Sequence, residues 1–303
     1  MTSMFSFLPV AAAIFWSSSS VGLASWFSIL SILPGLIPVL FASLFLFTFA
    51  HHIVAHFIST ALMILGSKEM WRIFTGDKDI DESLWVLIIP LVISIVNYLE
   101  CAELVWQGAL SLAVGILLFL IFAYQIAARE NQFDHINRNI QALVTLVFYP
   151  GFFFAYATKL TTLPHPSWTL VGFLVMVFCN DIFAYVFGML FGKSNRNIFP
   201  VSPKKSLAGF IGGFIFSIVG ALVIYYMGAP IFGGSIFNVV LISAVIGIVA
   251  PVGDLIESAM KRAANTKDSG NYIPGRGGIM DNIDSLIFSA PIYYYLIIYL
   301  CLT

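Results

Sequence analysis

The sequence predicts an all-α, polytopic integral membrane protein with about nine or ten transmembrane helices. Hydrophobic residues make up 60% of its 303 residues and charged residues only 10%, against roughly 25% in an average soluble domain. A water-soluble fold of this length could not hide so much apolar surface. Several charge-free runs also approach or exceed the ~20 residues that a helix needs to cross the hydrocarbon core of a bilayer.

The N-terminal stretch is expected to hold two or three of these helices. Residues 1–67 contain no Lys, Arg, Asp or Glu, and candidate breaks lie at Ser17 to Ser20 and at Pro34-Gly35 with Pro38. A secretory signal peptide carries a basic n-region. The absence of such a basic region favours membrane helices that stay in the protein over a cleaved signal.

Seven further crossings are expected after residue 83. One is expected in each of the runs 84–99, 104–128, 139–158, 160–192 and 285–303, and the charge-free run 206–253 is long enough for two. The turn residues Gly228-Ala229-Pro230 and Gly233-Gly234 would divide that long run. We divide the chain into N-terminal membrane helices over 1–160 and a second membrane domain over 161–303.

The basic residues divide unevenly between the two ends of these crossings. An even number of crossings separates the loops 67–83, 129–138, 193–205 and 257–283, so all four lie on one side of the membrane. They hold 13 of the 14 basic residues, and only Lys159 falls on the other side. Lys and Arg collect in cytoplasmic loops. We therefore expect these four loops, and the polar residues in them, to face the cytoplasm.

The segment 254–284 concentrates charges, glycines and turn residues. Asp254, Glu257, Ser258 and Lys261 follow the spacing i, i+3, i+4, i+7, so in a helix they share one face. A polar stripe at the end of a transmembrane helix would face the bundle interior or a water-filled cavity. The alternative is an ordinary salt bridge between Glu257 and Lys261 at a solvated helix end.

Three aspartates flank this segment and suggest a metal site. Asp281 and Asp284 stand at the start of the last helix, and Asp254 precedes the loop. Magnesium favours carboxylate oxygens combined with substrate phosphates, and such an ion can clamp the phosphates of a nucleotide. A favourable interaction of Asp281 and Asp284 with the helix dipole is the structural alternative.

Two glycine-rich basic motifs could bind phosphate. The first is the turn from Ile273 to Gly278, which contains Arg276 and whose glycines let backbone N–H groups approach an anion. The second is Ser202-Pro203-Lys204-Lys205-Ser206, which precedes Gly209 and Gly212-Gly213. Two lysines before a helix N-terminus can bind phosphate, or can simply meet anionic headgroups while the glycines permit close helix packing.

These motifs resemble the signature of the phosphatidate cytidylyltransferases, also called CDP-diglyceride synthases. The segments that carry the resemblance are Gly253-Asp254, Glu257-Ser258, Lys261-Arg262, Lys267-Asp268-Ser269-Gly270, Pro274-Gly275-Arg276-Gly277-Gly278, Asp281 and Asp284, with the 202–206 motif and Asp181 upstream. The resemblance covers roughly residues 165–303. The chain departs from the family pattern at Arg276, where His is usual, at Asn282, where Arg is usual, and at Ala208, where an acid is common.

The resemblance implies a Mg²⁺-dependent attack of the phosphatidate phosphate on the α-phosphate of CTP, which releases diphosphate in phospholipid biosynthesis. It implies catalytic roles for Asp254, Lys261, Asp281 and Asp284, and metal ligation by the three aspartates, with a second cation left open. Asp181, upstream of the 202–206 motif, also fits the family pattern. Substrate contacts are implied for Ser202, Lys204, Lys205, Ser258, Arg262, Lys267, Asp268 and Arg276.

The partners expected are CTP, phosphatidate and membrane lipid, with no nucleic acid, and the family suggests a homodimer. One alternative is a CTP-dependent polyprenol or phytol kinase, or a related CDP-lipid synthase. A transporter, with Asp181 and the aspartate cluster as an ion pathway, is the alternative from another class. Transporters often show paired halves with broken helices, and the sequence shows no such symmetry.

Overall fold

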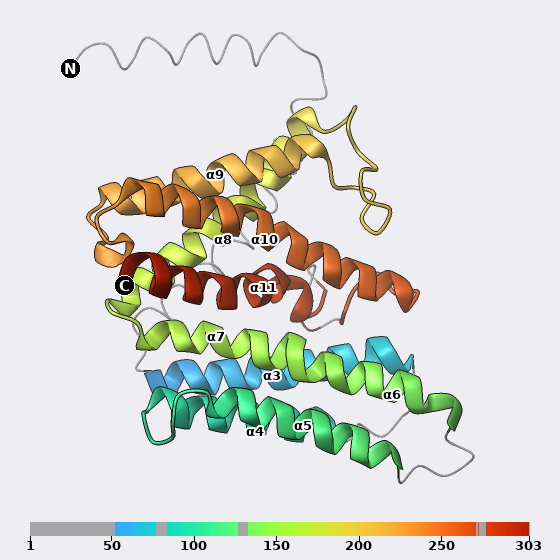
Figure 1. The fold of residues 1–303 in the computed structure, drawn as a ribbon. Coiled ribbons are helices and arrows are strands. Elements are labelled where there is room, and N and C mark those ends of the chain that lie inside the picture. Colours follow the sequence, from blue (N-terminus) through green and yellow to red (C-terminus); the bar gives the residue numbers. More distant parts are fainter. Residues whose placement is uncertain (1–51, 77–83, 127–132, 271, 273–276, 303) are drawn as a thin grey trace, which may run out of the picture.

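The computed structural model describes residues 52–76, 84–126, 133–270, 272 and 277–302 (Figure 1). In this part of the chain the regular structure is helical, and the β-structure is limited to isolated bridge residues, among them the pair Arg196 and Ser206. The all-α prediction is therefore confirmed. The helices expected before residue 52 lie outside the described residues.

Eight membrane-crossing segments account for the described helices. They are α3 (His52–Thr75), α4 (Trp85–Cys101), α5 (Ala109–Ile126), α6 (Phe133–Leu146) with the π-helical Val147–Phe153 and α7 (Phe154–Lys159), α8 (Pro166–Phe191), α9 (Leu207–Tyr226), α10 (Ile236–Ala263) and α11 (Met280–Ile297). Seven are long and apolar enough to cross a membrane, and α4 is a shorter apolar helix. All seven helices expected after residue 83 are present, six of them long and apolar enough to cross a membrane and the seventh, α4, shorter.

Three predicted loops are too long. The loop expected over 257–283 is helical to Ala263 and again from Met280, and the loop expected over 129–138 is helical from Phe133. The loop expected to begin at residue 67 is helical as far as Thr75, at the end of α3. Each crossing was expected to end where charge begins, but Lys, Glu and Arg are good helix formers. As a result, Lys68, Glu69 and Arg72 lie on the last turns of a membrane helix rather than in a loop.

The helices form two groups that α11 joins. Figure 1 shows α8, α9 and α10 along one side of the molecule and α3 to α7 along the other, with α11 between them. Helix α11 packs against α10 and against α7, while α8 and α9 form the most extensive helix pair. Two sequence-distant parts of the chain are thereby brought against the same helix.

Three glycines of α9 allow its close contact with α8. A Cβ atom on Gly209 would lie 2.6 Å from the carbonyl oxygen of Ala184, and one on Gly213 would lie 2.8 Å from that of Asn180. A Cβ on Gly212 would lie 2.5 Å from the Phe187 ring. Small residues let membrane helices approach closely. These positions therefore serve the helix packing that the sequence left as one of two explanations.

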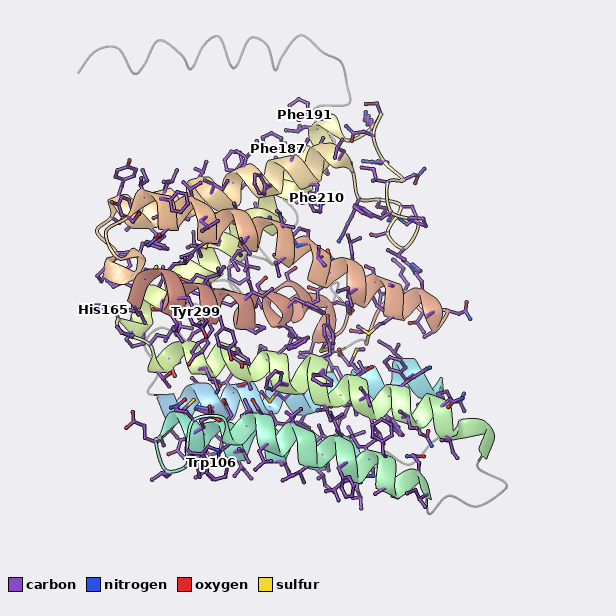
Figure 2. All side chains as sticks on the ribbon, in the orientation of Figure 1. Trp106, His165, Phe187, Phe191, Phe210 and Tyr299 are labelled. Carbon is purple, nitrogen blue, oxygen red and sulfur yellow. The ribbon has the colours of Figure 1, made fainter. Side chains whose placement is uncertain are left out.

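The outer surface of the helices is apolar. Figure 2 shows side chains such as Trp106 and Phe191 at the edge of the molecule, and these are 64% and 58% exposed. A soluble protein rarely leaves so many large apolar side chains uncovered. The arrangement suits a surface that contacts lipid acyl chains.

Charge is concentrated at the two ends of the helices. The α8–α9 connection and the C-terminal end of α10 lie at the same end (Figure 1), together with the last turns of α3. Most of the described basic residues are found there: Lys68, Arg72, Arg138, Lys193, Arg196, Lys204, Lys205, Lys261, Arg262 and Lys267. Lys159 ends α7 at the opposite end. The predicted segregation of basic residues therefore holds in the described residues.

Candidate active site

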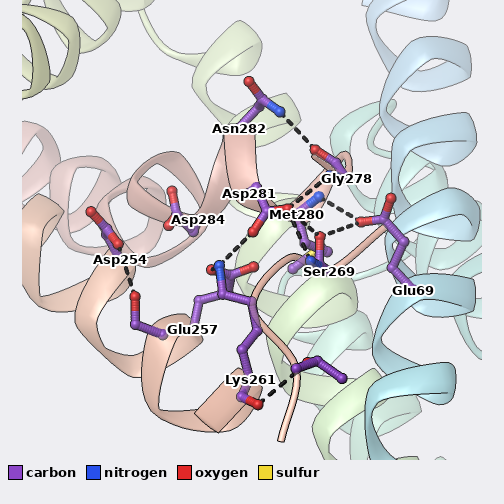
Figure 3. Close-up of polar contacts among 12 residues, drawn as sticks. Glu69, Asp254, Glu257, Lys261, Ser269, Gly278, Met280, Asp281, Asn282 and Asp284 are labelled. Atoms are coloured by element: carbon purple, nitrogen blue, oxygen red, sulfur yellow. Dashed lines mark hydrogen bonds and ion pairs between the residues drawn. The ribbon is translucent and has the colours of Figure 1, made fainter. Parts of the chain in front are cut away.

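The candidate site lies where α10 ends and α11 begins. Figure 3 shows Asp254, Glu257 and Lys261 from α10, Asp281 and Asp284 from α11, and Glu69 from α3 around this point. The α8–α9 connection, which carries Lys205, reaches the same place through an ion pair with Asp254. Elements from both halves of the chain therefore meet here.

The polar stripe of α10 is buried. Helix α10 continues to Ala263, so the four predicted residues share one face. Glu257 is fully buried and Lys261 is only 8% exposed. The Lys261 ammonium group forms ion pairs with both Glu257 and Asp281. It therefore joins α10 to α11 (Figure 3), and the alternative of a solvated surface salt bridge is wrong.

Asp281 organises the loop that precedes its own helix. Its Oδ1 contacts Lys261, and its Oδ2 accepts hydrogen bonds from the backbone N–H of Ser269 at 2.9 Å and of Gly278 at 2.7 Å. Gly277 has a φ of +87°, and a Cβ there would overlap the Asp281 carboxylate. Only glycine suits both conditions, which explains one glycine of the turn.

Asp254 links the 202–206 motif to α10. Lys205 Nζ lies 2.7 Å from Asp254 Oδ2, and Ser258 Oγ donates to Asp254 Oδ1 at 3.4 Å. Lys205 immediately precedes Ser206, which caps α9 by accepting a hydrogen bond from the N–H of Gly209 at 3.1 Å. The structure thus brings the 202–206 motif against the start of the 254–284 segment, as expected from their shared face.

Asp284 lies deeper, among other carboxylates. It is 7% exposed, and its Oδ1 accepts a hydrogen bond from the N–H of Ser285 at 2.7 Å. Its charge is within electrostatic reach of Asp254, Glu257 and Asp181. Ser285 Oγ also lies 3.5 Å from Asp181 Oδ1. Asp181 is therefore part of this cluster, whereas its neighbour in sequence, Asn180, is a buried structural residue that donates to the Gly247 carbonyl.

Five carboxylates and two ammonium groups make up the cluster. The acids are Asp181, Asp254, Glu257, Asp281 and Asp284, and the ion pairs are made by Lys205 and Lys261. Such an excess of negative charge, with Glu257 and Asp284 buried, favours a bound cation. No ready-made metal group of three or more His, Cys, Asp or Glu residues exists among the described residues. The predicted metal set stays a prediction.

Glu69 is a site residue that sequence reasoning missed. It is fully buried, and its carboxylate accepts hydrogen bonds from the N–H of Ile279 at 2.7 Å and of Met280 at 2.8 Å. An acidic residue inside a membrane helix is a functional-site hypothesis by default. The sequence contains this acidic residue, but the loop expected over 67–83 places Glu69 outside the membrane helix.

The remaining predicted residues lie around the rim of the cluster. Arg262 Nε donates to the carbonyl of Val201 at 3.3 Å, which joins the end of α10 to the α8–α9 connection. Ser202 is half-buried, whereas Lys204, Lys267 and Asp268 are exposed. Arg276 lies outside the described residues.

Comparison with known proteins extends the resemblance beyond the signature. The model of the cytidylyltransferase family matches residues 31–300. This match is wider than the region of roughly 165–303 that the motifs had indicated, and it includes Glu69. The N-terminal helices are therefore part of the family pattern and not merely a series of membrane helices.

Individual relatives match over shorter stretches. The chain is 35% identical over 181 residues to a phosphatidate cytidylyltransferase of Staphylococcus haemolyticus. The matched stretch covers 59% of this chain and 66% of the relative. The chain is 36% identical over 151 residues to a phosphatidate cytidylyltransferase of Aquifex aeolicus, 49% of this chain and 54% of the relative. It is also 36% identical over 164 residues to the uncharacterized protein YnbB of Escherichia coli, 49% of this chain and 53% of the relative.

The chain thus spans less than two thirds of the length of each of these three relatives. The family match, in contrast, runs through nearly all of the described helices and the complete carboxylate cluster. On that match, the chain belongs to the cytidylyltransferase family.

Proposed function

We propose that the protein is a phosphatidate cytidylyltransferase, which converts CTP and phosphatidate into CDP-diacylglycerol and diphosphate. The observation that carries the proposal is the convergence of Lys205, Lys261 and the aspartates at one end of α10 and α11. The curated relatives named for this activity support the choice of reaction. Family membership supports the choice of CTP as the nucleotide.

The chemistry needs charge stabilisation more than a base. A phosphate oxygen of phosphatidate forms a bond to the α-phosphorus of CTP, and the bond between that phosphorus and the bridging oxygen breaks to release diphosphate. The attacking group is already an anion, so no histidine is needed to deprotonate it. Lys205 and Lys261 would offset the negative charge that develops in transfer. Replacement of the usual His by Arg276 is therefore compatible with the reaction.

Mg²⁺ is the proposed cofactor, with a second cation as an open alternative. The donor chemistry fits, because Glu257 Oε1 is buried and lacks a hydrogen-bond partner in the described part of the chain, and Mg²⁺ takes oxygen ligands from a few carboxylates plus substrate phosphates. Asp281 has both oxygens engaged. Asp254 also has both oxygens engaged, by Lys205 and Ser258, so Asp284 is the better donor among the three predicted aspartates. When bound, Mg²⁺ would offset the negative charge of the CTP phosphates.

The rim residues would gather the two anionic substrates. Lys204 and Lys267 are exposed cations beside the cluster, and Arg262, Arg276, Ser202, Ser258 and Asp268 complete the proposed substrate-binding set. A basic opening raises the local concentration of anions. We propose that this end faces the cytoplasm, where CTP is found, and that the phosphate of phosphatidate reaches it from the membrane interface. A homodimer stays a prediction from the family.

Labelled CTP tests the reaction class directly. The purified protein, reconstituted in vesicles with phosphatidate and Mg²⁺, receives CTP labelled at either the α- or the γ-phosphate. The expected result is α-label in lipid and γ-label in free diphosphate. Transfer of the γ-label to a polyprenol or phytol instead would identify a lipid kinase. Absence of any CTP-dependent lipid product would contradict the proposal.

The orientation of the site has its own test. Single cysteines replace Asn195, in the α8–α9 connection, and Ser235, between α9 and α10, in a background without Cys101, Cys179 and Cys301. A membrane-impermeant maleimide is then applied to intact cells. The position 235 cysteine should react and the position 195 cysteine should react only after lysis. The reverse pattern would place the site on the opposite face.

A further inference from the structure

The N-terminus of α11 lacks an ordinary cap. The first N–H groups of any helix have no partner within the helix, and a Ser, Thr, Asp or Asn at the N-cap position commonly satisfies one. The N-cap of α11 is Ile279, whose side chain forms no capping hydrogen bond. The backbone N–H groups at this position must therefore donate their hydrogen bonds to groups outside the helix.

Two carboxylates accept the backbone hydrogen bonds that an N-cap side chain would otherwise accept. Asp281 accepts from the N–H of Gly278 at 2.7 Å, within its own turn. Glu69 Oε1 accepts from the N–H of Ile279 at 2.7 Å, and its Oε2 accepts from the N–H of Met280 at 2.8 Å. Glu69 stands 210 and 211 residues earlier in the chain than these two donors. A residue of α3 therefore caps the helix that carries Asp281 and Asp284.

Ser269 connects the two carboxylates. Its hydroxyl lies 2.9 Å from Glu69 Oε2 and 3.0 Å from Asp281 Oδ2, and with a single proton it donates to one of them at a time. Asp281 in turn contacts Lys261. A continuous chain of polar contacts, visible in Figure 3, thus runs from α3 through the signature loop to α10.

The loop is shaped around the Glu69 carboxylate. A Cβ atom on Gly270 would lie 2.6 Å from Glu69 Oε1, and one on Gly278 would lie 2.5 Å from both carboxylate oxygens. Real Cβ atoms do not approach other atoms this closely, so neither position accepts a side chain while Glu69 stays in place. Two glycines of the loop are therefore matched to a residue of the other half of the chain.

We propose that Glu69 is a positioning residue, which holds Ser269, the backbone of Ile279 and Met280, and through them Asp281, in the arrangement that CMP transfer requires. The inference rests on the proposed function for its catalytic consequence. Glu69 acts through Ser269 and the start of α11, and no contact with a substrate is assigned to it. Displacement of a reacting group by about 1 Å can cost on the order of 100-fold in rate.

The test compares two buried glutamates in the full-length protein. Glu69→Gln places an amide N–H₂ group against N–H donors, because both oxygens of Glu69 are acceptors. Glu100→Gln is the matched control: Glu100 is 3% exposed and also accepts a backbone hydrogen bond, from Leu110 at 2.8 Å, but at the opposite end of the helices. Both variants are purified and assayed for CMP transfer, thermal unfolding and hydrogen–deuterium exchange.

For Glu69→Gln we expect kcat to fall about 30- to 100-fold while KM for CTP changes by less than about threefold. Exchange in a peptide that covers residues 277–283 should become faster. Glu100→Gln should lower the unfolding temperature at least as much, with kcat and exchange at 277–283 unchanged. Ser269→Ala removes the hydroxyl group that connects the Glu69 and Asp281 carboxylates, so it should also lower kcat. The double variant should lose no more activity than the more affected single variant, because both substitutions break the same contact.

The proposal is overturned if Glu69→Gln keeps kcat within about twofold of the wild-type value, or if exchange at 277–283 stays at the wild-type rate. It is also overturned if the loss of activity follows the loss of stability equally in both glutamate variants. Should Glu69→Gln fail to fold, Ser269→Ala alone decides by the same two readouts. A wild-type protein that exchanges normally but transfers no CMP would refute the proposed function, and the exchange data would still decide whether Glu69 holds the loop.

Discussion

Buried charged groups occur at both ends of the helices, but positive and negative charges balance at only one of the two ends. At the end opposite the candidate site, Glu100 and Lys159 form a single ion pair, 3% and 8% exposed, and Glu100 Oε2 accepts from the N–H of Leu110. Each charge has a partner there. At the candidate site, five carboxylates surround Lys205 and Lys261. A balanced pair can serve stability alone, whereas an excess of buried carboxylates favours a bound cation.

The ion pair at the far end also explains the exception to the charge distribution. Lys159 is the one basic residue that the topology places away from the other 13. Its Nζ contacts Glu100 and lies 5.4 Å from the centre of the Tyr156 ring. A lysine that is neutralised in this way adds no net positive charge to that face, so it does not weigh against the orientation set by the other residues.

The largest expected effect comes from the lysine that bridges α10 and α11. Lys261→Met keeps the length of the side chain and leaves Glu257 and Asp281 without their shared cation. CMP transfer should fall about 1000-fold, because a preorganised positive group aimed at developing charge is lost. The assay uses protein that elutes as a single species and is normalised to folded material.

The matched control for this variant is Lys159→Met. It also removes one partner of a buried pair, which typically destabilises a protein by about 3–5 kcal/mol. Its rate per folded molecule should stay within about twofold of wild type. If the two methionine variants lose activity to the same extent, the distinction between the two ends fails.

Asp284→Asn should have the next largest effect. Asp284 is a proposed Mg²⁺ donor within a cluster of acids, so loss of its charge should lower transfer about 100-fold at fixed Mg²⁺. The Mg²⁺ concentration needed for half-maximal rate should also rise. A Mg²⁺ titration of the variant measures both quantities. An unchanged titration curve would remove Asp284 from the metal site.

Lys205→Ala should have a smaller effect, mainly on substrate binding. The lysine pairs with Asp254 at 2.7 Å and is half-buried. Loss of one charge-assisted phosphate contact costs about 1.5–3 kcal/mol, which corresponds to roughly 10- to 100-fold in kcat/KM for CTP. Lys193→Ala, an exposed lysine of the same connection, is the control and should leave kcat/KM unchanged. Similar losses in the two variants would indicate general attraction of anions rather than a specific contact.

The smallest effect on activity is expected for Tyr156→Phe, at the far end. Tyr156 and Tyr295 hydroxyl groups lie 2.9 Å apart, which links α7 to α11. Removal of one hydroxyl should cost about 0.5–1.5 kcal/mol of stability and leave CMP transfer unchanged. Thermal unfolding and the transfer assay together check this. A clear loss of activity would show that the end opposite the candidate site contributes to the reaction.

Much of the fold was predictable from composition and pattern. The seven crossings after residue 83 follow from the lengths of the apolar runs, and the shared face of Asp254, Glu257 and Lys261 follows from helical periodicity. The signature motif indicated the family from residue types and their spacing alone. Each of these inferences uses only local information, since hydropathy and spacing along one helix do not depend on which helices pack together.

The partners of the site residues could not be read from the sequence. The pairing of Lys205 with Asp254, the bridging position of Lys261 and the contacts of Glu69 with Ser269, Ile279 and Met280 all join separate parts of the fold. Such contacts depend on how α3, α10 and α11 pack against one another. The charge-based boundary at residue 67 also concealed Glu69, because a helix can continue through charged residues when their side chains find partners in the fold.

The sequence by itself therefore determined the membrane-spanning helices, the end at which charge gathers and the family. The tertiary structure decided which acids are engaged by cations and backbone amides and which lie among other acids. The physical reason is that a carboxylate has no fixed role of its own, because its neighbours determine what it binds. Asp281 and Asp284 are three residues apart on one helix, yet Asp281 is held by Lys261 and loop amides, whereas Asp284 accepts a hydrogen bond from the N–H of Ser285 and lies among the other acids of the cluster.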